Sequence, residues 1–173
     1  KVIAPPAAAT TPLSEQKDNV LWFDVISDIH LSKFHSENGA NFHRYVEQER
    51  PLVAPAFTLV TGDIADSHSA SHSIPLHSKQ QVDEWQEYKT VLEKAGLWGS
   101  DVWVDMVGNH DVMGVQDDKA DNFLAAQYLS WQPSREGLKT PEFVYTKNDT
   151  RVQIILMNAA SFPGVALNYV GDF

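Results

Sequence analysis

The 173-residue sequence predicts an α/β fold built on a largely parallel sheet. Three short apolar runs, rich in β-branched and aromatic residues, alternate with helical patterns, and each run ends at a polar cluster. Strands that alternate with helices join through right-handed crossovers, which bring the carboxyl ends of the strands to one edge of the sheet. The sequence therefore predicts that functional side chains gather at that edge.

The first predicted strand is the run 21–27, Leu-Trp-Phe-Asp-Val-Ile-Ser, which is apolar enough to be mostly buried. It ends at Asp28 and His30. Residues 40–50 then show a helical pattern. We expect Pro51 to stop this helix, because proline lacks the amide hydrogen that a helix interior needs.

The second predicted strand covers residues 56–61 and ends at Asp63, which follows a glycine. After a polar loop, Ser78 is a candidate cap for a second helix, and Gly96 is expected to end it. The inward stripe of this helix is expected to consist of Val82, Trp85, Lys89 and Leu92.

The third predicted strand, 102–107, ends at the Gly-Asn-His-Asp sequence of residues 108–111. Residues 117–130 have a helical pattern. Residues 142–146 and 151–158 predict an antiparallel hairpin, which adds a late antiparallel pair to the sheet.

Composition narrows the possible functions. The chain has 23 acidic against 13 basic residues and a net charge of −10, so it lacks the basic surface that non-specific nucleic-acid binding needs. With no cysteine, it has no disulfides, thiolate metal sites or cysteine nucleophiles. No run approaches the roughly 20 apolar residues of a membrane span. Residues 1–19, rich in proline, alanine and threonine, predict an extended arm or linker ahead of a unit over 20–173.

The strand ends carry candidate metal ligands. Asp28 and His30 lie two positions apart, so their side chains project to the same face and can bind one divalent ion. The preceding glycine lets the backbone approach closely at Asp63, and the two carboxylate oxygens there can bridge two ions. Asn109 offers a neutral amide oxygen. We therefore predict metal binding by Asp28, His30, Asp63 and Asn109.

The charge of such a site favours a phosphate substrate. The positive charge of two divalent cations exceeds the negative charge of Asp28 and Asp63. The excess positive charge attracts a phosphoryl group and lowers the pKa of bound water. His110 projects differently from its neighbour, which makes it a candidate general acid. Asp111 is expected to orient His110 by accepting its other N–H. The sequence thus predicts metal-dependent hydrolysis of a phosphate mono- or diester.

These residues resemble the calcineurin-like metallophosphoesterases. Residues 28–30 (Asp-Ile-His), 62–63 (Gly-Asp) and 108–111 (Gly-Asn-His-Asp) are similar to the first three motifs of that family. The stretch 27–34 resembles the transmembrane protein 62 subgroup, as does the helix preceding the third motif. Asp66 stands where purple acid phosphatases have a ligand tyrosine, which disfavours that relative.

The resemblance implies a four-layer α/β/β/α sandwich, of which residues 20–173 form the N-terminal part. It implies a dinuclear Mn, Fe or Zn site, with Asp28, His30, Asp63 and Asn109 as ligands and a catalytic role for His110. The subgroup resemblance further implies a parent protein anchored in an internal membrane, within an endomembrane or other organelle compartment.

The sequence departs from the family in one respect. The family completes its site with downstream histidines, whereas no histidine follows His110 here. Either the chain is a fragment of a phosphoesterase, whose activity we expect in the parent protein, or it is a non-catalytic scaffold or subunit. In both cases the exposed sheet needs a missing C-terminal half or a partner protein to cover it.

Other polar and aromatic residues predict structural positions. A solvated loop is expected for His68, His72 and His77, and surface positions are expected for His35 and His43. Asn148 fits either a glycosylation acceptor or a plain turn. Core packing is expected for Trp22, Trp85, Trp98 and Trp103, and partial exposure for Trp131.

Overall fold

The computed structural model describes residues 20–68, 79–135, 141–148, 150–160 and 162–164. Its strands and α-helices are, in chain order, β1 (Asp24–Ile26), α1 (Ser36–Arg44), α2 (Arg50–Val53), β2 (Thr58–Val60), α3 (Val82–Lys94), β3 (Trp103–Asp105), α4 (Ala125–Tyr128), α5 (Gln132–Arg135), β4 (Glu142–Lys147) and β5 (Thr150–Ile155).

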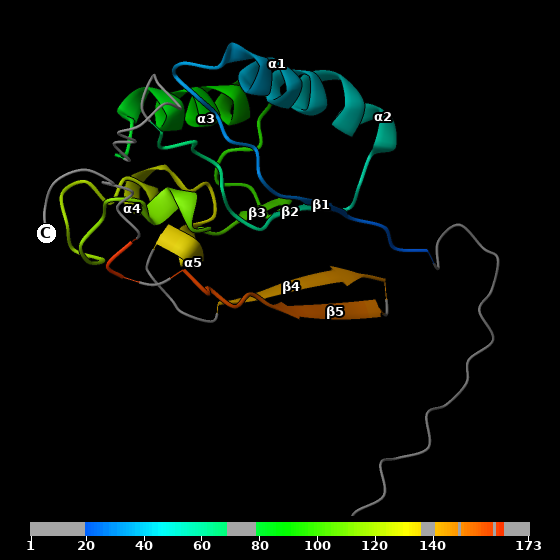
Figure 1. Ribbon diagram of the computed structural model, residues 1–173. Helices are drawn as coiled ribbons and strands as arrows, with labels where there is room; N and C mark the ends of the chain where they lie inside the picture. The colour runs from blue at the N-terminus through cyan, green and yellow to red at the C-terminus, as the bar shows by residue number, and fades with distance from the viewer. Residues whose placement is uncertain (1–19, 69–78, 136–140, 149, 161, 165–173) are drawn as a thin grey trace, which may run out of the picture.

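The first three strands form the predicted parallel sheet, in the order β1-β2-β3. Val25, Leu59 and Val104 are aligned across it. Figure 1 shows α1 and α3 over one face of this sheet and the β4–β5 hairpin on the other. The mixed α/β fold class is therefore confirmed.

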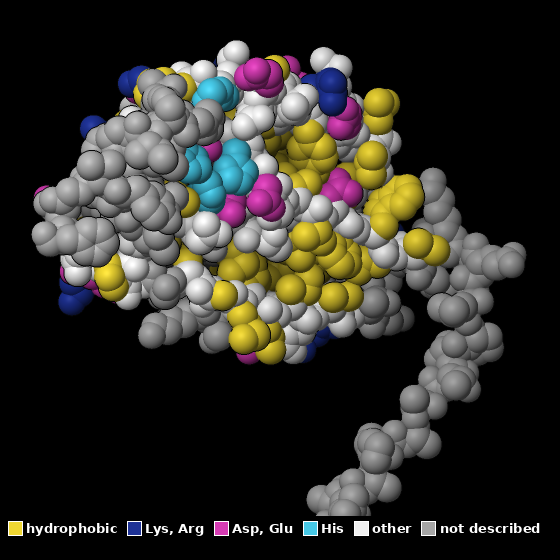
Figure 2. All heavy atoms as spheres, in the orientation of Figure 1, with side chains coloured by type: hydrophobic (Ala, Val, Ile, Leu, Met, Phe, Trp, Pro, Cys, Tyr) yellow, Lys and Arg dark blue, Asp and Glu magenta, His cyan; other side chains and the backbone are white. Residues whose placement is uncertain are grey.

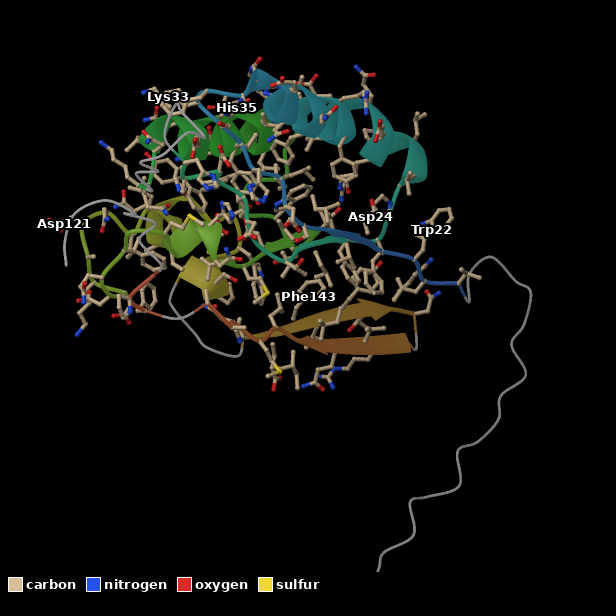
Figure 3. The ribbon with its side chains drawn as sticks, in the orientation of Figure 1. Trp22, Asp24, Lys33, His35, Asp121 and Phe143 are labelled. Atoms are coloured by element: carbon tan, nitrogen blue, oxygen red, sulfur yellow. The ribbon has the colours of Figure 1, made fainter. Side chains whose placement is uncertain are left out.

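The hairpin is confirmed, but it forms a sheet of its own and does not extend the parallel one. Lys147 pairs with Thr150 at its turn. Phe143 points from β4 toward the parallel sheet (Figure 3), and its ring contacts Phe57 at a centroid distance of 4.9 Å. The two sheets thus enclose a core, which consists of Phe57, Leu59, Val104, Trp131, Phe143 and Leu156.

The first helix passes the proline that was expected to stop it. A π-helical turn, Tyr45–Glu49, joins α1 to α2, and the Arg50 N–H bonds the Tyr45 carbonyl five residues back. This wider turn accommodates Pro51, because the ring no longer has to fit a regular helix interior. The helix ends instead at Ala54, whose φ of 48° is left-handed.

The second helix is confirmed as α3, although its buried face is rotated from the predicted stripe. Val82 is exposed, and the Lys89 ammonium lies 5.1 Å from the centre of the Trp98 ring. The candidate cap Ser78 lies outside the described residues. The residues of α3 that are buried are Glu84, Trp85, Tyr88, Val91 and Leu92.

The helix predicted over 117–130 is wrong except for α4. The Lys119 N–H donates to the Asp117 side chain at 2.8 Å, and the Asn122 amide donates to the Gly114 carbonyl. Such local side-chain bonds offer the backbone an alternative to helical hydrogen bonding. The segment is therefore a series of turns.

Two tryptophan predictions are also wrong. Trp22, expected in the core, is 59% exposed, and it extends away from the body of the fold in Figure 3. It lies beside β1, which pairs with β2 alone among the described strands. Trp131, expected to be partly exposed, is buried against Phe143. None of the described helices is long and apolar enough to cross a membrane.

Candidate metal centre

The three predicted motifs follow the carboxyl ends of β1, β2 and β3. Asp28, His30 and Asp63 all have left-handed backbone, with φ of 54°, 47° and 54°. Non-glycine residues adopt this conformation at a cost of about 1–3 kcal/mol, and such residues cluster at functional sites. Cross-strand bonds stabilise it here: the Asp28 N–H donates to the Gly62 carbonyl and the His30 N–H to the Asp63 carbonyl.

Asp28, His30 and Asp63 converge. Each offers a ligand atom, and these atoms lie within 4.8 Å of one another. His30 Nε2 lies 3.6 Å from the Asp28 carboxylate. Histidine and acidic side chains gather in a hollow on this face, next to an apolar band (Figure 2). Two carboxylates and an imidazole are a donor set that suits a first-row divalent cation.

Asn109 lies on the same side of the site as Asp63. Both residues line a groove of about 470 Å³ between the parallel sheet and the hairpin. Asp63 is held in place from behind, because its Oδ1 accepts a 2.8 Å hydrogen bond from the His110 N–H. The structure thus brings the fourth predicted ligand into the same groove as Asp63.

The His110 ring packs edge-on against His30, with ring centres 4.3 Å apart. His110 Nδ1 lies 2.8 Å from the backbone carbonyl of Asp66. Since a carbonyl only accepts, Nδ1 is the donor in this pair. Nε2 is then the nitrogen of His110 available to a substrate.

Asp111 does not orient His110 as predicted. Its fully buried carboxylate accepts backbone N–H bonds from Ile64, Ala65 and Gly108 at 2.8–3.0 Å. Burial raises the pKa of Asp111 to about 7, although these bonds act in the opposite direction. The physical reason is the 3-10 turn His110–Val112, in which consecutive side chains diverge by about a third of a turn. The Asp111 carboxylate therefore links the loops that follow β2 and β3. The Asp66 carbonyl, and not Asp111, orients the His110 ring.

Asp66 and His68 are functional candidates that the sequence reasoning missed. The Asp66 carboxylate lies 2.9 Å from His68 Nδ1 and 3.5 Å from His30 Nδ1. His68, expected in a solvated loop, is largely buried, with its ring centre 5.0 Å from that of His110. The Leu31–Ala65 bridge continues the strand pairing and carries Asp66 toward the site, a tertiary contact that no sequence motif signals. His72 and His77 lie outside the described residues.

Asp66 and His30 shift each other's pKa values. Burial alone would raise the pKa of Asp66, but hydrogen bonds from His30, His68 and Ser32 hold it well below its usual range. The bond to Asp66 in turn raises the pKa of His30, against the opposing effect of burial. His30 thus presents Nδ1 to Asp66 and Nε2 toward Asp28. With Nδ1 oriented by Asp66, Nε2 is the ring nitrogen that would bind a metal.

Two further histidines lie at opposite ends of the first helix. His35 immediately precedes α1, and His43 is in its last turn, 3.7 Å from Glu47 and 3.3 Å from Glu87. The surface position predicted for His43 is confirmed.

Comparison with known proteins identifies the family. The calcineurin-like phosphoesterase profile matches residues 21–162. Mouse transmembrane protein 62 is 32% identical over 123 residues, which cover 63% of this chain and 19% of that protein. An Arabidopsis thaliana protein named "Putative metallophosphoesterase" is 31% identical over 124 residues, 69% of this chain and 16% of that protein. The chain thus spans less than a fifth of either relative. Because the family profile covers most of the sequence, including all three strand-end motifs, we conclude that the chain belongs to the calcineurin-like phosphoesterase family.

Proposed function

We propose that the protein hydrolyses a phosphate mono- or diester, with two divalent ions held by Asp28, His30, Asp63 and Asn109 and with His110 as the general acid. The observation that carries this proposal is the convergence of Asp28, His30 and Asp63 within 4.8 Å at the strand ends. Membership of a phosphoesterase family supports the reaction class. Mn, Fe and Zn are the metals proposed, because each accepts imidazole and carboxylate ligands.

The charge balance of the site supports a phosphate substrate. When bound, divalent ions supply positive charge that neutralises a phosphoryl group and promotes attack by water. Asp28 and Asp63 offset only part of the charge of two such ions. The Asp66 carboxylate faces Nδ1 of His30 and so orients the imidazole ring of this proposed ligand.

His110 would protonate the leaving alkoxide. Its Nδ1 is engaged by the Asp66 carbonyl, so Nε2 is the atom that would carry the transferred proton. General acid catalysis of this kind contributes about 10²–10⁴-fold to a rate. A backbone carbonyl fixes the ring without adding a charge that would compete with the substrate.

A non-catalytic scaffold is the second candidate function. The groove beside Asp63 and Asn109 is lined mainly by apolar residues, among them Met106, Ile155 and Met157. Exposed apolar surface of this kind favours a covering segment or partner. We propose accordingly that residues 20–173 form the N-terminal part of the phosphoesterase domain. The arm expected over 1–19 lies outside the described residues. A C-terminal half or partner would cover the groove, and the parent protein would be anchored in an internal membrane.

Metal binding and hydrolysis test the proposal together. Calorimetric titration of the complete parent protein with Mn²⁺ is expected to show binding by the wild type and none by Asp63→Ala. Asp121→Ala is the matched control, because Asp121 is exposed and lies outside the three strand-end motifs, at the outer edge of the molecule in Figure 3. With Mn²⁺, hydrolysis of p-nitrophenyl phosphate or its bis-ester should follow the same pattern. Unchanged Mn²⁺ binding and unchanged hydrolysis in Asp63→Ala would refute the metal site. Mn²⁺ binding without hydrolysis by the wild-type protein would favour the scaffold.

A further inference from the structure

The start of α3 contacts the loops that follow all three strands of the parallel sheet. We define the motif loops as residues 27–34, 61–68 and 108–113, which follow β1, β2 and β3. Two buried polar side chains bond to these loops: Gln80, just ahead of α3, and Glu84, in its first turn. Among the described residues, neither side chain bonds to the strands themselves. Neither residue belongs to the three sequence motifs.

Gln80 links the second and third motif loops. The two hydrogens of its side-chain amide are shared among three acceptors: the His110 carbonyl at 2.9 Å, the Met113 carbonyl at 3.1 Å and the Ser67 hydroxyl at 3.0 Å. The Trp85 indole N–H donates to Gln80 Oε1 at 3.1 Å. Because the indole can only donate, it fixes which end of the amide faces the loops.

Glu84 links the first and second motif loops. It is 1% exposed, and its two carboxylate oxygens accept from different loops: Oε1 from the Lys33 N–H and Oε2 from the Ser67 N–H, both at 3.1 Å. Burying a carboxylate is costly unless it is hydrogen-bonded. Here the compensating donors come entirely from loop backbone, so the bonds restrain the loops as much as they satisfy the carboxylate.

These bonds act directly on the candidate site. The His110 backbone is held on both sides of its Cα, because its N–H donates to Asp63 and its carbonyl accepts from Gln80. Ser67 follows Asp66 in the chain. The Asp66 carbonyl accepts a hydrogen bond from His110 Nδ1, and the Asp66 carboxylate faces His30. A shift of the start of α3 would therefore change the spacing between the metal ligands and the proton donor.

We propose that Gln80 and Glu84 are positioning residues, which set the spacing of the three motif loops and so align His110 with the metal ligands. The proposal rests on the proposed phosphoesterase function and adds to it two residues that contact neither metal nor substrate. Displacement of a catalytic group by about 1 Å costs on the order of 10²-fold in rate. Removal of groups that orient metal ligands costs about 10–100-fold in metal affinity.

Gln80→Met is the decisive variant, because it keeps the length of the side chain and removes its donors. Tyr88→Phe is the matched control: it also removes buried hydrogen bonds of α3, the 2.7 Å bond to Asp105 and the 2.8 Å bond from the Trp103 indole N–H, and both partners lie in β3, outside the motif loops. Thermal unfolding measures the stability lost in each. Amide hydrogen exchange of the His110 N–H then reports the local restraint, independently of metal or activity.

We expect Gln80→Met to speed His110 amide exchange by about tenfold or more beyond any uniform change, and to weaken Mn²⁺ binding by about 10–100-fold. With p-nitrophenyl phosphate, kcat should fall more than KM changes. Tyr88→Phe should lower the stability. It should not change the Mn²⁺ affinity or the exchange rate of the His110 amide relative to other amides. Glu84→Gln should speed exchange at Lys33 and Ser67.

The proposal is overturned if Gln80→Met and Tyr88→Phe give the same exchange pattern and the same Mn²⁺ affinity at equal stability. If Gln80→Met does not fold, Trp85→Phe replaces it, since it removes the donor that orients the Gln80 amide, and thermal unfolding measures the stability lost with the buried ring volume. A complete wild-type parent protein that neither binds Mn²⁺ nor hydrolyses phosphate esters refutes the proposed function. The His110 exchange rates still decide whether Gln80 restrains the loop.

Discussion

The backbone N–H of His110 donates a 2.8 Å hydrogen bond to Oδ1 of Asp63, 47 residues earlier in the chain. The proposed proton donor and the proposed bridging ligand are thereby parts of one unit. Asp63 has two separable contributions, the negative charge that a metal requires and the acceptor atom that holds the third strand-end loop.

Comparing two substitutions separates these contributions. Asp63→Asn retains an acceptor for the His110 N–H but loses the charge, whereas Asp63→Ala loses both. We expect both variants to lose Mn²⁺ binding. Without metal, Asp63→Ala should in addition be less stable than Asp63→Asn by about 1–2 kcal/mol in urea unfolding, the contribution of a hydrogen bond to a partly buried acceptor. Equal stability of the two variants would show that the bond does not hold the loop.

The general-acid role of His110 predicts a dependence on the leaving group. His110→Asn should slow hydrolysis of phenyl phosphate by about 10²–10⁴-fold and of p-nitrophenyl phosphate by less, because nitrophenolate leaves without needing a proton. Parallel rate measurements on the two esters, with Mn²⁺ saturating, check this. An equal loss on both substrates would point to a metal-positioning role for His110.

Gly62 is required by both conformation and space. Its φ is +104°, and a Cβ there would lie 2.5 Å from the Cα of Gly108. Gly99 is a matched control, because its φ is also positive, at +68°, and a Cβ there meets nothing within 4 Å. We expect Gly99→Ala to cost about 1–2 kcal/mol, the conformational cost alone, and Gly62→Ala to cost more. Urea unfolding and Mn²⁺ titration measure the difference. Similar effects of the two substitutions would mean that the loops yield to the added methyl group.

The Asp66 carboxylate predicts a change in the titration of His30. The pKa of His30 is raised because its protonated form is stabilised by the bond to Asp66, so Asp66→Asn should lower that pKa. NMR titration of the imidazole signals in metal-free protein measures it. Asp83→Asn, which removes a surface partner of Lys33, serves as control. An unchanged His30 pKa in Asp66→Asn would show that other carboxylates determine it.

Glu84 predicts a pH dependence of stability. Burial raises the pKa of this carboxyl from 4.5 to about 7, so between these values the folded state binds more protons than the unfolded state. The contribution of Glu84 to stability is therefore present at low pH and declines as pH rises through this interval, by at most about 1.4 kcal/mol per pH unit. Urea unfolding from pH 4.5 to 7 should show a smaller decline in Glu84→Gln. The same slope in both proteins would assign the pH dependence to other groups.

Much of the scaffold could be predicted from the sequence, because its signals are local. The apolar runs ending at Asp28, Asp63 and Asn109 are contiguous, and parallel topology brings such strand ends together whatever the details of packing. The hairpin followed from the alternating pattern on either side of its turn. Where a local rule was applied alone it failed, as at Pro51, which a π-helical turn accommodates.

The tertiary structure decided which polar groups meet. Asp111 is adjacent to His110 in sequence, yet its carboxylate bonds the backbone 46 and 47 residues away, while the Asp66 carbonyl, 44 residues away, receives the His110 ring. Likewise, Gln80 and Glu84 reach the motif loops only because α3 packs over the sheet. Sequence patterns determined the strands and the site they share, because periodicity and chain order act locally. The hydrogen-bond partners depended on the packing of distant segments, which leaves no mark in the spacing of residues along the chain.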